Sequence, residues 1–493
     1  MADVNSTLPL LAVGASLGVV PLLLSARSPD VREGWTLAAG LAKLALVLSM
    51  LPSVLGGENL FFQVAEVFPG VPIAFRVDAM GILFALISSS LWIVTSLYSI
   101  GYMRGLKEHG QTRYYCYFAL ALFSTLGVAF SANLLTLYLF YELLSFATYP
   151  LVTHHQDPEA RSAGRRYLLY IVGGSIGLVL PAMLVCYGAA NTLDFVPDGI
   201  LKQAGFSGLE LATLLLMFLF GFAKAAIMPF HGWLPAAMVA PTPVSALLHA
   251  VAVVKVGVFS ILRVLAGIFG LELLGSSGLD SLVLALAAAT MVAASLAALC
   301  QDGLKRMLAY STVGQLSYII LGGALLSPEG LQGAMAHLAT HALGKISLFF
   351  CAGALYVATG KQRISQMHGI GRRMPLTMGA FLAASLSIMG VPPLAGFLSK
   401  WYLALGCVAT EQTVPLMVLL LSSLLNAAYL MPVVYKAFFL PIPKGEPTER
   451  LPELSSLCTW APLVTALGCV LLFFFPGVLL DLTALAVREV WRV

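Results

Sequence analysis

Fourteen mostly apolar segments follow one another along the chain, and these segments determine its fold class. Each is close to the roughly 20 residues that an α-helix needs to cross the hydrocarbon core of a bilayer. Only 10% of the 493 residues are charged, whereas soluble proteins average roughly 25%. The sequence therefore predicts an all-α polytopic membrane protein with about 14 transmembrane helices. The predicted spans are residues 7–25, 35–54, 77–101, 114–131, 133–153, 166–190, 209–235, 241–265, 279–300, 305–326, 330–358, 375–404, 413–440 and 459–482.

The distribution of basic residues predicts the orientation. An even number of spans places both termini on one side of the membrane. If that side is external, seventeen of the 27 Lys and Arg residues lie in cytoplasmic loops or at cytoplasmic span ends, where such residues are retained. Only Arg76, Lys202, Arg488 and Arg492 are then external. We therefore predict a multi-pass protein of the cell (inner) membrane with both termini outside. The first span is expected to be retained, since no basic segment typical of a cleaved signal peptide precedes it.

Charge and motif content exclude several classes of function. The net charge is only +4, so the chain lacks the dense basic face that binds nucleic acid. The seven cysteines occur singly, without the spacing of a zinc, haem or iron–sulfur site. No phosphate-binding loop or nucleophile motif is present. We expect no cofactor, no metal and no catalysis by the chain alone, and we expect His154 and His155, in a polar loop, to be solvated.

Charged side chains inside the spans carry the functional prediction. Glu142 is the single acidic residue well inside a span, while Asp78 begins the third span. A charge at membrane depth costs about 2.5 kcal/mol or more, so it usually faces a partner or a wet cavity and marks function. The alternative is that Glu142 has only a structural role and joins two helices through a polar contact. Six basic residues also lie inside spans: Lys43, Lys224, Lys255, Arg263, Lys345 and Lys400. Lys43 and Arg263 are expected to extend toward an interface and are left out of the mechanism.

Two spans are interrupted by proline, and each carries one lysine. In the seventh span Lys224 precedes Pro229 and Pro235. In the twelfth span Lys400 follows the second of two adjacent prolines, Pro392 and Pro393. A broken helix is tolerated in lipid only where it is buried in protein or lines a water-filled cavity. Two such spans, one in each half of the chain, indicate an inverted-repeat transporter with its path at the bilayer midplane.

This pattern divides the chain into four parts. We predict an N-terminal three-helix region, two inverted five-helix repeats that each contain one broken helix, and a C-terminal span with its tail. The predicted boundaries are 1–110, 111–270 for spans 4–8, 271–440 for spans 9–13, and 441–493.

The eighth and eleventh spans carry histidine together with lysine. His249 and Lys255 are six residues apart and therefore about 120° apart around a helix. They cannot share one face, but they can face two neighbouring chambers. His337, His341 and Lys345 recur every four residues and lie on one stripe. Two histidines without a nearby carboxylate or cysteine make a poor metal site, so a proton wire is the better interpretation. A core histidine bonded to a serine or carbonyl is the ordinary alternative for each one.

Four segments carry a resemblance to a known family. The segments are FAKAAIMPFHGWLPAAMVAPTPVSALLHAVAVVKVGVFSILR, LKRMLAYSTVGQLSYI, HLATHALGKISLFFCAGAL and GVPPLAGFLSKWYLALG. They resemble the antiporter-like subunits shared by respiratory complex I, membrane-bound hydrogenases and the Mrp-type sodium/proton antiporters. The resemblance extends from about Asp78 to Lys436. The segment CAGALYVATGKQRISQMHGIGRRMP looks most like the D subunit of the Mrp-type antiporters.

The resemblance implies roles for residues of the first repeat. Glu142 corresponds to the family's fifth-helix glutamate and Lys224 to its seventh-helix lysine. The two form an ion pair whose opening and closing alters the proton affinity of the lysine. Lys255 corresponds to the lysine at the centre of the eighth helix.

The resemblance also implies roles for residues of the second repeat. His337, His341 and Lys345 correspond to connecting residues of the eleventh helix, and Lys400 to the terminal residue of the twelfth helix. Some relatives carry glutamate where this chain has Lys400, which changes the charge of the final site and leaves the direction of release open.

Several assemblies remain open as the setting of this relay. The first hypothesis is a proton-translocating subunit of a multisubunit sodium/proton antiporter, inactive without its partner subunits. The second is the pump subunit of a complex I-like NADH-quinone oxidoreductase or an energy-converting hydrogenase. A third is a membrane subunit of an inorganic-carbon uptake complex, and a fourth is a structural scaffold with a decayed path. A sodium cage within this chain is not expected, because sodium needs several oxygen ligands and only one intramembrane carboxylate is present.

Overall fold

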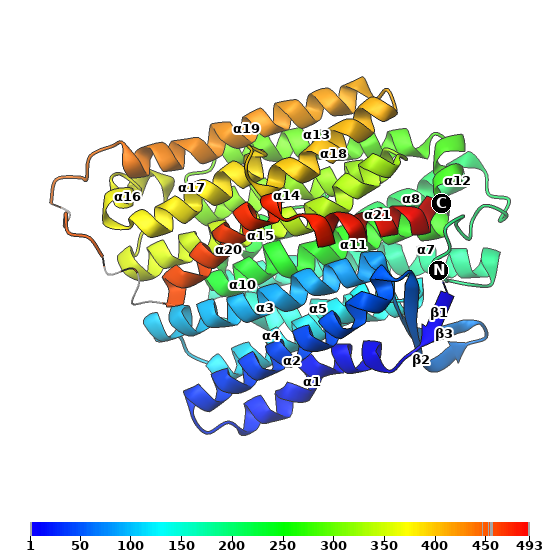
Figure 1. Cartoon of the computed structure of the whole chain (residues 1–493), viewed down its shortest axis with the longest axis horizontal. Helices are drawn as coiled ribbons and strands as arrows, with labels where there is room; N and C mark the ends of the chain where they lie inside the picture. The colour runs from blue at the N-terminus through cyan, green and yellow to red at the C-terminus, as the bar shows by residue number, and fades with distance from the viewer. Residues whose placement is uncertain (1, 446, 452, 454–456, 492–493) are drawn as a thin grey trace.

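The computed structural model describes residues 2–445, 447–451, 453 and 457–491. Its long helices run side by side in one bundle (Figure 1). Both ends of the described chain lie at the same end of the bundle, because Asp3 and Val490 line one cavity. The predicted all-α membrane fold is confirmed, with one small sheet added to it.

The N-terminal region combines three long helices with this sheet. The sheet has the order β1-β2-β3, with β1 parallel and β3 antiparallel to β2. Gly70, with φ of 74°, closes the turn between β2 and β3, a backbone conformation that glycine adopts without steric cost. The sequence analysis assigned no element to residues 55–76. The elements are β1 (Ala2–Asn5), α1 (Leu8–Ser25), α2 (Pro29–Leu55), β2 (Glu58–Phe68), β3 (Val71–Val77) and α3 (Ala79–Gly105).

The next part of the chain contains five predicted spans, and three of them deviate from a regular α-helix. The sixth begins at Pro158, eight residues before the predicted start, because Asp157 caps it by accepting a hydrogen bond from the Ala160 amide at 2.7 Å. The elements are α4 (Gln111–Ala129), α5 (Leu134–Val152), α6 (Pro158–Gly174), the π-helical η1 (Ser175–Val179), α7 (Leu180–Ala190), α8 (Gly208–Gly221), the 3-10 helix η2 (Ala223–Ala225), α9 (Trp233–Ala236), the 3-10 helix η3 (Ala237–Val239), α10 (Thr242–Ala246), the π-helical η4 (Leu247–Val251), α11 (Val253–Val264) and the π-helical η5 (Leu265–Phe269).

The remaining elements form the second half of the bundle. They are α12 (Leu271–Ser276), α13 (Leu279–Leu299), α14 (Leu304–Ala324), α15 (Pro328–Thr359), the 3-10 helix η6 (Ile364–Gln366), α16 (Ile370–Arg373), α17 (Pro375–Met389), α18 (Ala395–Ala409), α19 (Thr413–Phe438), α20 (Leu457–Phe474) and α21 (Gly477–Trp491). The predicted fourteenth span thus consists of two helices, α20 and α21.

Every predicted span coincides with helix, but their number as membrane crossings stays a prediction. Ten helical segments in the described chain are long and apolar enough to cross a membrane. The other four predicted spans are α4, α14 and the two interrupted segments α8–α9 and α17–α18.

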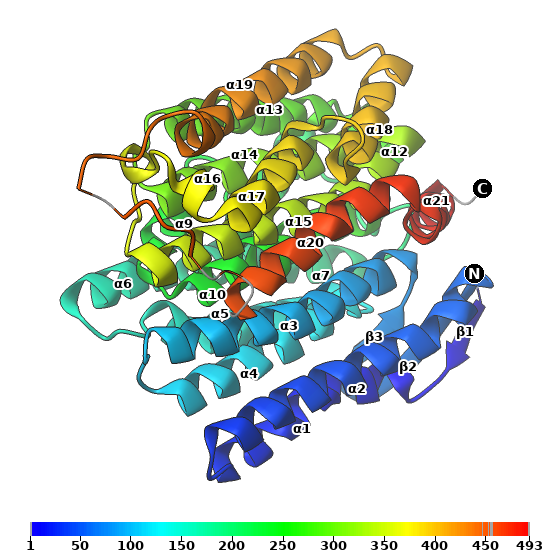
Figure 2. The same cartoon turned by 60° about the vertical axis from the view of Figure 1, so that its left-hand side comes forward.

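The core of the bundle surrounds the segment Thr242–Phe269, whose most apolar window is completely buried within the protein. Helix α15 packs against α14, α17, α18 and α20 and also contacts η4. Helices α1 and α2 lie on one flank of the bundle, with α13 and α19 on the opposite flank (Figure 2). The lysine of α11 and the histidines and lysine of α15 are therefore buried inside the protein.

Candidate functional site

The first interrupted span holds Lys224 within its break. Helix α8 ends at Gly221, and η2 carries Lys224 before the chain turns toward α9. Pro229 lies in this break and Pro235 in the short α9 beyond it. Backbone groups freed by the break find side-chain partners. The Trp233 indole donates to the Ala223 carbonyl at 2.9 Å, and the amide of Lys224 donates to the Tyr141 hydroxyl at 3.1 Å.

Close packing of α11 also fixes this break. A Cβ atom added at Gly257 would lie 2.2 Å from the amide nitrogen of Ala225 and 2.4 Å from the carbonyl carbon of Lys224. Only glycine allows so close an approach of two backbones. The position of Lys224 is therefore set by the same helix that carries Lys255.

The Lys224 ammonium is bound to α5 but is not paired with Glu142. Its Nζ donates to the Tyr141 carbonyl at 2.8 Å and to the Ser145 hydroxyl at 2.7 Å. Both oxygens of the Glu142 carboxylate are buried, and neither has a hydrogen-bond partner within the described residues. Since residues three apart on a helix are neighbours, the carboxylate lies on the side of α5 that Lys224 already contacts. In this structure Lys224 and Glu142 are therefore unpaired, an arrangement that we call open.

Lys255 and His341 are in direct contact at the centre of the bundle. Lys255 Nζ lies 2.7 Å from His341 Nδ1, and both side chains are buried. The rings of His341 and His337 are stacked, with centroids 5.7 Å apart. His337 Nδ1 lies 2.8 Å from the Ser399 hydroxyl, and His337 Nε2 lies 3.1 Å from Gln315 Oε1. These contacts join α11, α15, α14 and α18 through polar atoms.

Lys400 lies beside the second break. The break separates α17 from α18 and contains Pro392 and Pro393. Lys400 Nζ donates to the Met389 carbonyl and to the Ser423 hydroxyl, both at 3.0 Å. It also lies 4.8 Å from the centre of the Tyr318 ring, which stacks on His337. Lys400 therefore continues the line of contacts that begins at Lys255.

Two predicted site residues stand apart from this line. Lys345 donates to the Ser311 hydroxyl at 2.7 Å, which in turn lies 2.7 Å from the Tyr429 hydroxyl. It forms a branch toward α19. His249 lies in the π-helical η4, and neither ring nitrogen has a hydrogen-bond partner in the part of the chain that the structure describes. Its ring packs on Phe349 with centroids 4.8 Å apart.

Two basic residues that the sequence analysis left out are buried and bonded, so the expectation that they extend to an interface is wrong. Arg263 forms a bidentate pair with Asp78 at 2.5 and 2.6 Å, and both residues are buried. Lys43 donates to the Ser16 hydroxyl at 2.9 Å and to the Leu122 carbonyl at 2.7 Å. The pair of Asp78 and Arg263 could have been suspected from the sequence, because both residues fall at span ends predicted to be external and therefore at the same side of the membrane.

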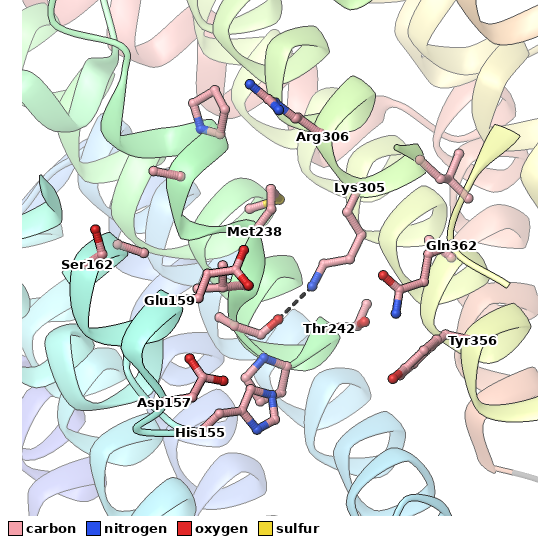
Figure 3. A pocket seen from close by; sticks show the side chains of 18 of the residues that line it. His155, Asp157, Glu159, Ser162, Met238, Thr242, Lys305, Arg306, Tyr356 and Gln362 are labelled. Atoms are coloured by element: carbon pink, nitrogen blue, oxygen red, sulfur yellow. Dashed lines mark hydrogen bonds between the residues drawn. The ribbon is translucent and has the colours of Figure 1, made fainter. Parts of the chain in front are cut away.

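Two cavities lie at opposite ends of α3. The first, of about 760 Å³, is lined by Tyr102 near the end of α3. Lys305 reaches across it from α14 and donates to the Ala240 carbonyl at 2.6 Å (Figure 3). The second, of about 790 Å³, is lined by Asp78 at the start of α3 and by Arg263. Residues 78 and 102 are about 36 Å apart along α3, at a rise of 1.5 Å per residue. The buried lysines and histidines therefore lie between the two cavities.

The histidines of the loop after α5 also differ from expectation. His154 is fully buried, with 0% exposure, rather than solvated. The reason is that the loop between α3 and α4 covers it, and its ring packs edge-on against Tyr114 with centroids 6.1 Å apart. His155 is half-buried and lines the first cavity.

Comparison with known proteins gives the family. Residues 131–426 match the family described as "NADH:quinone oxidoreductase/Mrp antiporter, TM". The chain is 34% identical to NADH-quinone oxidoreductase subunit N of Desulforudis audaxviator, with 92% of each chain covered. It is 32% identical to hydrogenase-4 component B of Escherichia coli over 88% of this chain and 69% of that protein. Na(+)/H(+) antiporter subunit A1 of Staphylococcus aureus is 31% identical over 91% of this chain, which spans 58% of that longer subunit.

Solved structures share the fold. A chain of the Mrp complex from Dietzia superposes with a TM-score of 0.86 at 22% identity, covering 98% of this chain and 97% of that one. A chain of the archaeal membrane-bound sulfane sulfur reductase superposes with the same TM-score at 25% identity and the same coverage. The protein therefore belongs to the NADH:quinone oxidoreductase/Mrp antiporter family, as a multi-pass membrane subunit of the Mrp and complex I-like cation/proton transporters.

Proposed function

We propose that this chain translocates protons from the buried side chains of Lys224, Lys255, His341 and His337 to the half-buried Lys400, with Lys345 on a branch. The observation that carries the proposal is the 2.7 Å contact between Lys255 Nζ and His341 Nδ1. It joins a group from each half of the chain, and both are side chains that accept and donate protons.

Glu142 acts as the switch in this proposal. A carboxylate next to an ammonium stabilises the charged form, whereas burial without a partner favours the neutral amine. In the open arrangement Lys224 is held by Ser145 and the Tyr141 carbonyl. Movement of Lys224 toward Glu142 would capture a proton, and movement back would release it toward Lys255. Waters must fill the gap between Lys224 and Lys255, because no hydrogen bond joins them among the described residues.

We further propose that the assembly containing this chain exchanges a monovalent cation, sodium, for protons, with this chain in a D-like position. The similarity to the Mrp complex and to antiporter subunit A1 supports the exchange of a cation for protons, whereas the D-like position rests on the resemblance of the segment CAGALYVATGKQRISQMHGIGRRMP alone. Glu142 is the single acidic residue well inside a predicted span, so sodium would cross in a partner subunit or at a subunit interface. The orientation in this proposal has both termini outside.

A redox-driven pump is the second candidate. It is favoured by the similarity to NADH-quinone oxidoreductase subunit N, which extends over 92% of both chains. In that case the same line of side chains would move protons when a partner subunit is reduced and reoxidised.

Proton flux across the membrane of everted vesicles separates the two candidates. The vesicles should contain the chain with its partner subunits, and flux should be recorded after a sodium pulse and, separately, after addition of NADH or another reductant. A sodium-dependent flux supports the antiporter, and a flux only with reductant overturns it in favour of the pump. Glu142→Gln should abolish whichever flux is present. Lys202→Ala, which removes an exposed lysine paired with Glu272, is the matched control and should leave flux unchanged.

A further inference from the structure

A cluster of three histidines and one glutamate lies outside the line of lysines. Glu108 and His109 belong to the loop between α3 and α4, while His154 and His155 follow α5 directly. Glu108 Oε2 lies 3.9 Å from His109 Nδ1, 3.9 Å from His154 Nε2 and 3.7 Å from His155 Nδ1. Three imidazole nitrogens therefore converge on one carboxylate oxygen.

His154 is the member that ordinary packing does not explain. It is 0% exposed, and its ring nitrogens make no well-aligned hydrogen bond among the described residues, although the ring lies near the backbone of His109. The distance to Glu108 is too long for a hydrogen bond. A buried polar group without a partner destabilises the folded state by about 1–3 kcal/mol. Such a group in a native structure therefore usually has a function. The ring nitrogen is directed at the same oxygen as its neighbours, which is the arrangement that a shared ligand would satisfy.

The spacing of these atoms is close to that of a metal site. In a tetrahedral zinc site with bonds of about 2.0–2.1 Å, neighbouring ligand atoms are about 3.4 Å apart. The three distances from Glu108 exceed this value by half an ångström or less. Ligand atoms of Glu108, His109 and His154 all lie within 4.8 Å of one another. These atoms would therefore have to move together by up to about 1.4 Å to bind one ion.

The two loops are held in place by bonds that do not use the ligand atoms. The Arg113 guanidinium donates to the His154 carbonyl at 2.8 Å. The Gln111 amide donates to the Glu108 carbonyl at 3.1 Å, and the amide of Glu108 donates to the Met103 carbonyl at 2.9 Å. These bonds fix the backbone on both sides and leave the side chains free to bind.

An ion can also reach the cluster from outside. Glu108 and His155 line the cavity of about 760 Å³, and Figure 3 shows His155 on its wall beside Asp157. His109 is exposed, with 60% of its side chain accessible. The cluster thus lies between the cavity and the surface of the protein.

We propose that Glu108, His109 and His154 bind a divalent transition-metal ion with the fourth coordination position left open, and that Zn²⁺ fits this set. Imidazole with carboxylate suits zinc and its neighbours, whereas Mg²⁺ and Ca²⁺ prefer oxygen ligands alone. The sequence analysis considered only the cysteine spacing and the histidines within single spans, so it did not find these three ligands, which come from two loops that the fold brings together.

Direct metal binding tests the proposal without any transport assay. The full chain is purified with a tag that lacks histidine, stripped with a chelator and equilibrated with Zn²⁺, and the bound metal is measured. We expect one Zn²⁺ per chain, and Co²⁺ in its place should give the visible absorption of a tetrahedral site. Replacing a ligand should weaken Zn²⁺ binding at least tenfold, since loss of mere supporting residues already costs about 10–100-fold.

The variants His109→Ala and Glu108→Gln both change side chains of loops near the surface, so the fold should survive, as thermal unfolding would verify. His368→Ala, a loop histidine outside the cluster, is the matched control and should bind Zn²⁺ as the wild type does. Binding of one Zn²⁺ that is lost in both ligand variants supports the site. Absence of saturable Zn²⁺ binding, or unchanged binding in the His109→Ala and Glu108→Gln double variant, would overturn it.

Discussion

The ammonium nitrogen of Lys255 lies 2.7 Å from Nδ1 of His341, in a part of the bundle where both side chains are buried. An ammonium has only donors, so His341 accepts at Nδ1 whenever Lys255 is charged, and the proton of a neutral ring is then on Nε2. That second nitrogen has no hydrogen-bond partner in the described residues. The ring can therefore take a proton on one side and give one on the other.

The first prediction separates a structural role of His341 from a proton-carrying one. Glutamine retains a hydrogen-bond acceptor for Lys255 but cannot be protonated. In His341→Gln we expect the complex to assemble while proton flux in vesicles falls about a hundredfold, the usual scale of a lost acid–base group. His368→Gln serves as the control. Flux at the wild-type rate in His341→Gln would show that the ring is only a packing element.

The second prediction concerns Ser145, whose hydroxyl holds Lys224 in the open arrangement. A hydrogen bond to a charged group contributes about 1.5–3 kcal/mol. Ser145→Ala should therefore shift Lys224 toward Glu142 and slow proton flux about tenfold or more. Ser145→Thr keeps the hydroxyl and should restore most of the flux. If the alanine and threonine variants behave alike, the hydroxyl has no part in the switch.

The third prediction tests the contact between α11 and the first break. Gly257→Ala would place a methyl group 2.2 Å from the Ala225 amide nitrogen. Overpacking of this kind costs about 1–3 kcal/mol, so the thermal unfolding temperature in detergent should fall. Gly379→Ala, where an added Cβ meets nothing within 4 Å, should leave that temperature unchanged or raise it. Equal effects of the two substitutions would contradict the close approach.

The fourth prediction concerns the buried pair of Asp78 and Arg263. Removing one member of such a pair costs about 3–5 kcal/mol, because the other charge remains buried. Asp78→Asn should destabilise the protein by this mechanism alone. Asparagine is as good a helix cap as aspartate, and its side-chain oxygen can still accept the hydrogen bond from the Gly81 amide that Asp78 accepts at 2.7 Å. The double variant Asp78→Asn with Arg263→Gln should regain stability. A double variant less stable than Asp78→Asn would argue against the pair.

The helices could be predicted from the sequence because the length and apolar character of a span are local properties. Each predicted span overlaps a helix, and the Pro229 and Pro392–Pro393 segments lie where the chain leaves helical geometry. The strands β2 and β3 were missed, because the prediction rested on apolar segments long enough to cross a membrane as a helix, and these strands have only 11 and 7 residues.

Contacts between helices could not be predicted in the same way. Lys255 and His341 are 86 residues apart, and Arg263 and Asp78 are 185 apart. Which faces meet depends on how α11, α15 and α3 rotate against one another, and periodicity within one helix does not give this. The π-helical turn at η4 adds a further shift between His249 and Lys255, because its hydrogen bonds span one residue more than those of an α-helix.

Proton translocation by the assembled complex carrying Lys255→Met tests the central claim most directly. Methionine fills much of the space of lysine but carries no proton, so it removes the link between the two halves and leaves packing in place. The account predicts that flux is lost, whereas Lys202→Met, at an exposed and salt-bridged position, translocates at the wild-type rate. Undiminished flux in Lys255→Met, with assembly verified by gel filtration, would contradict a path through the contact between Lys255 and His341.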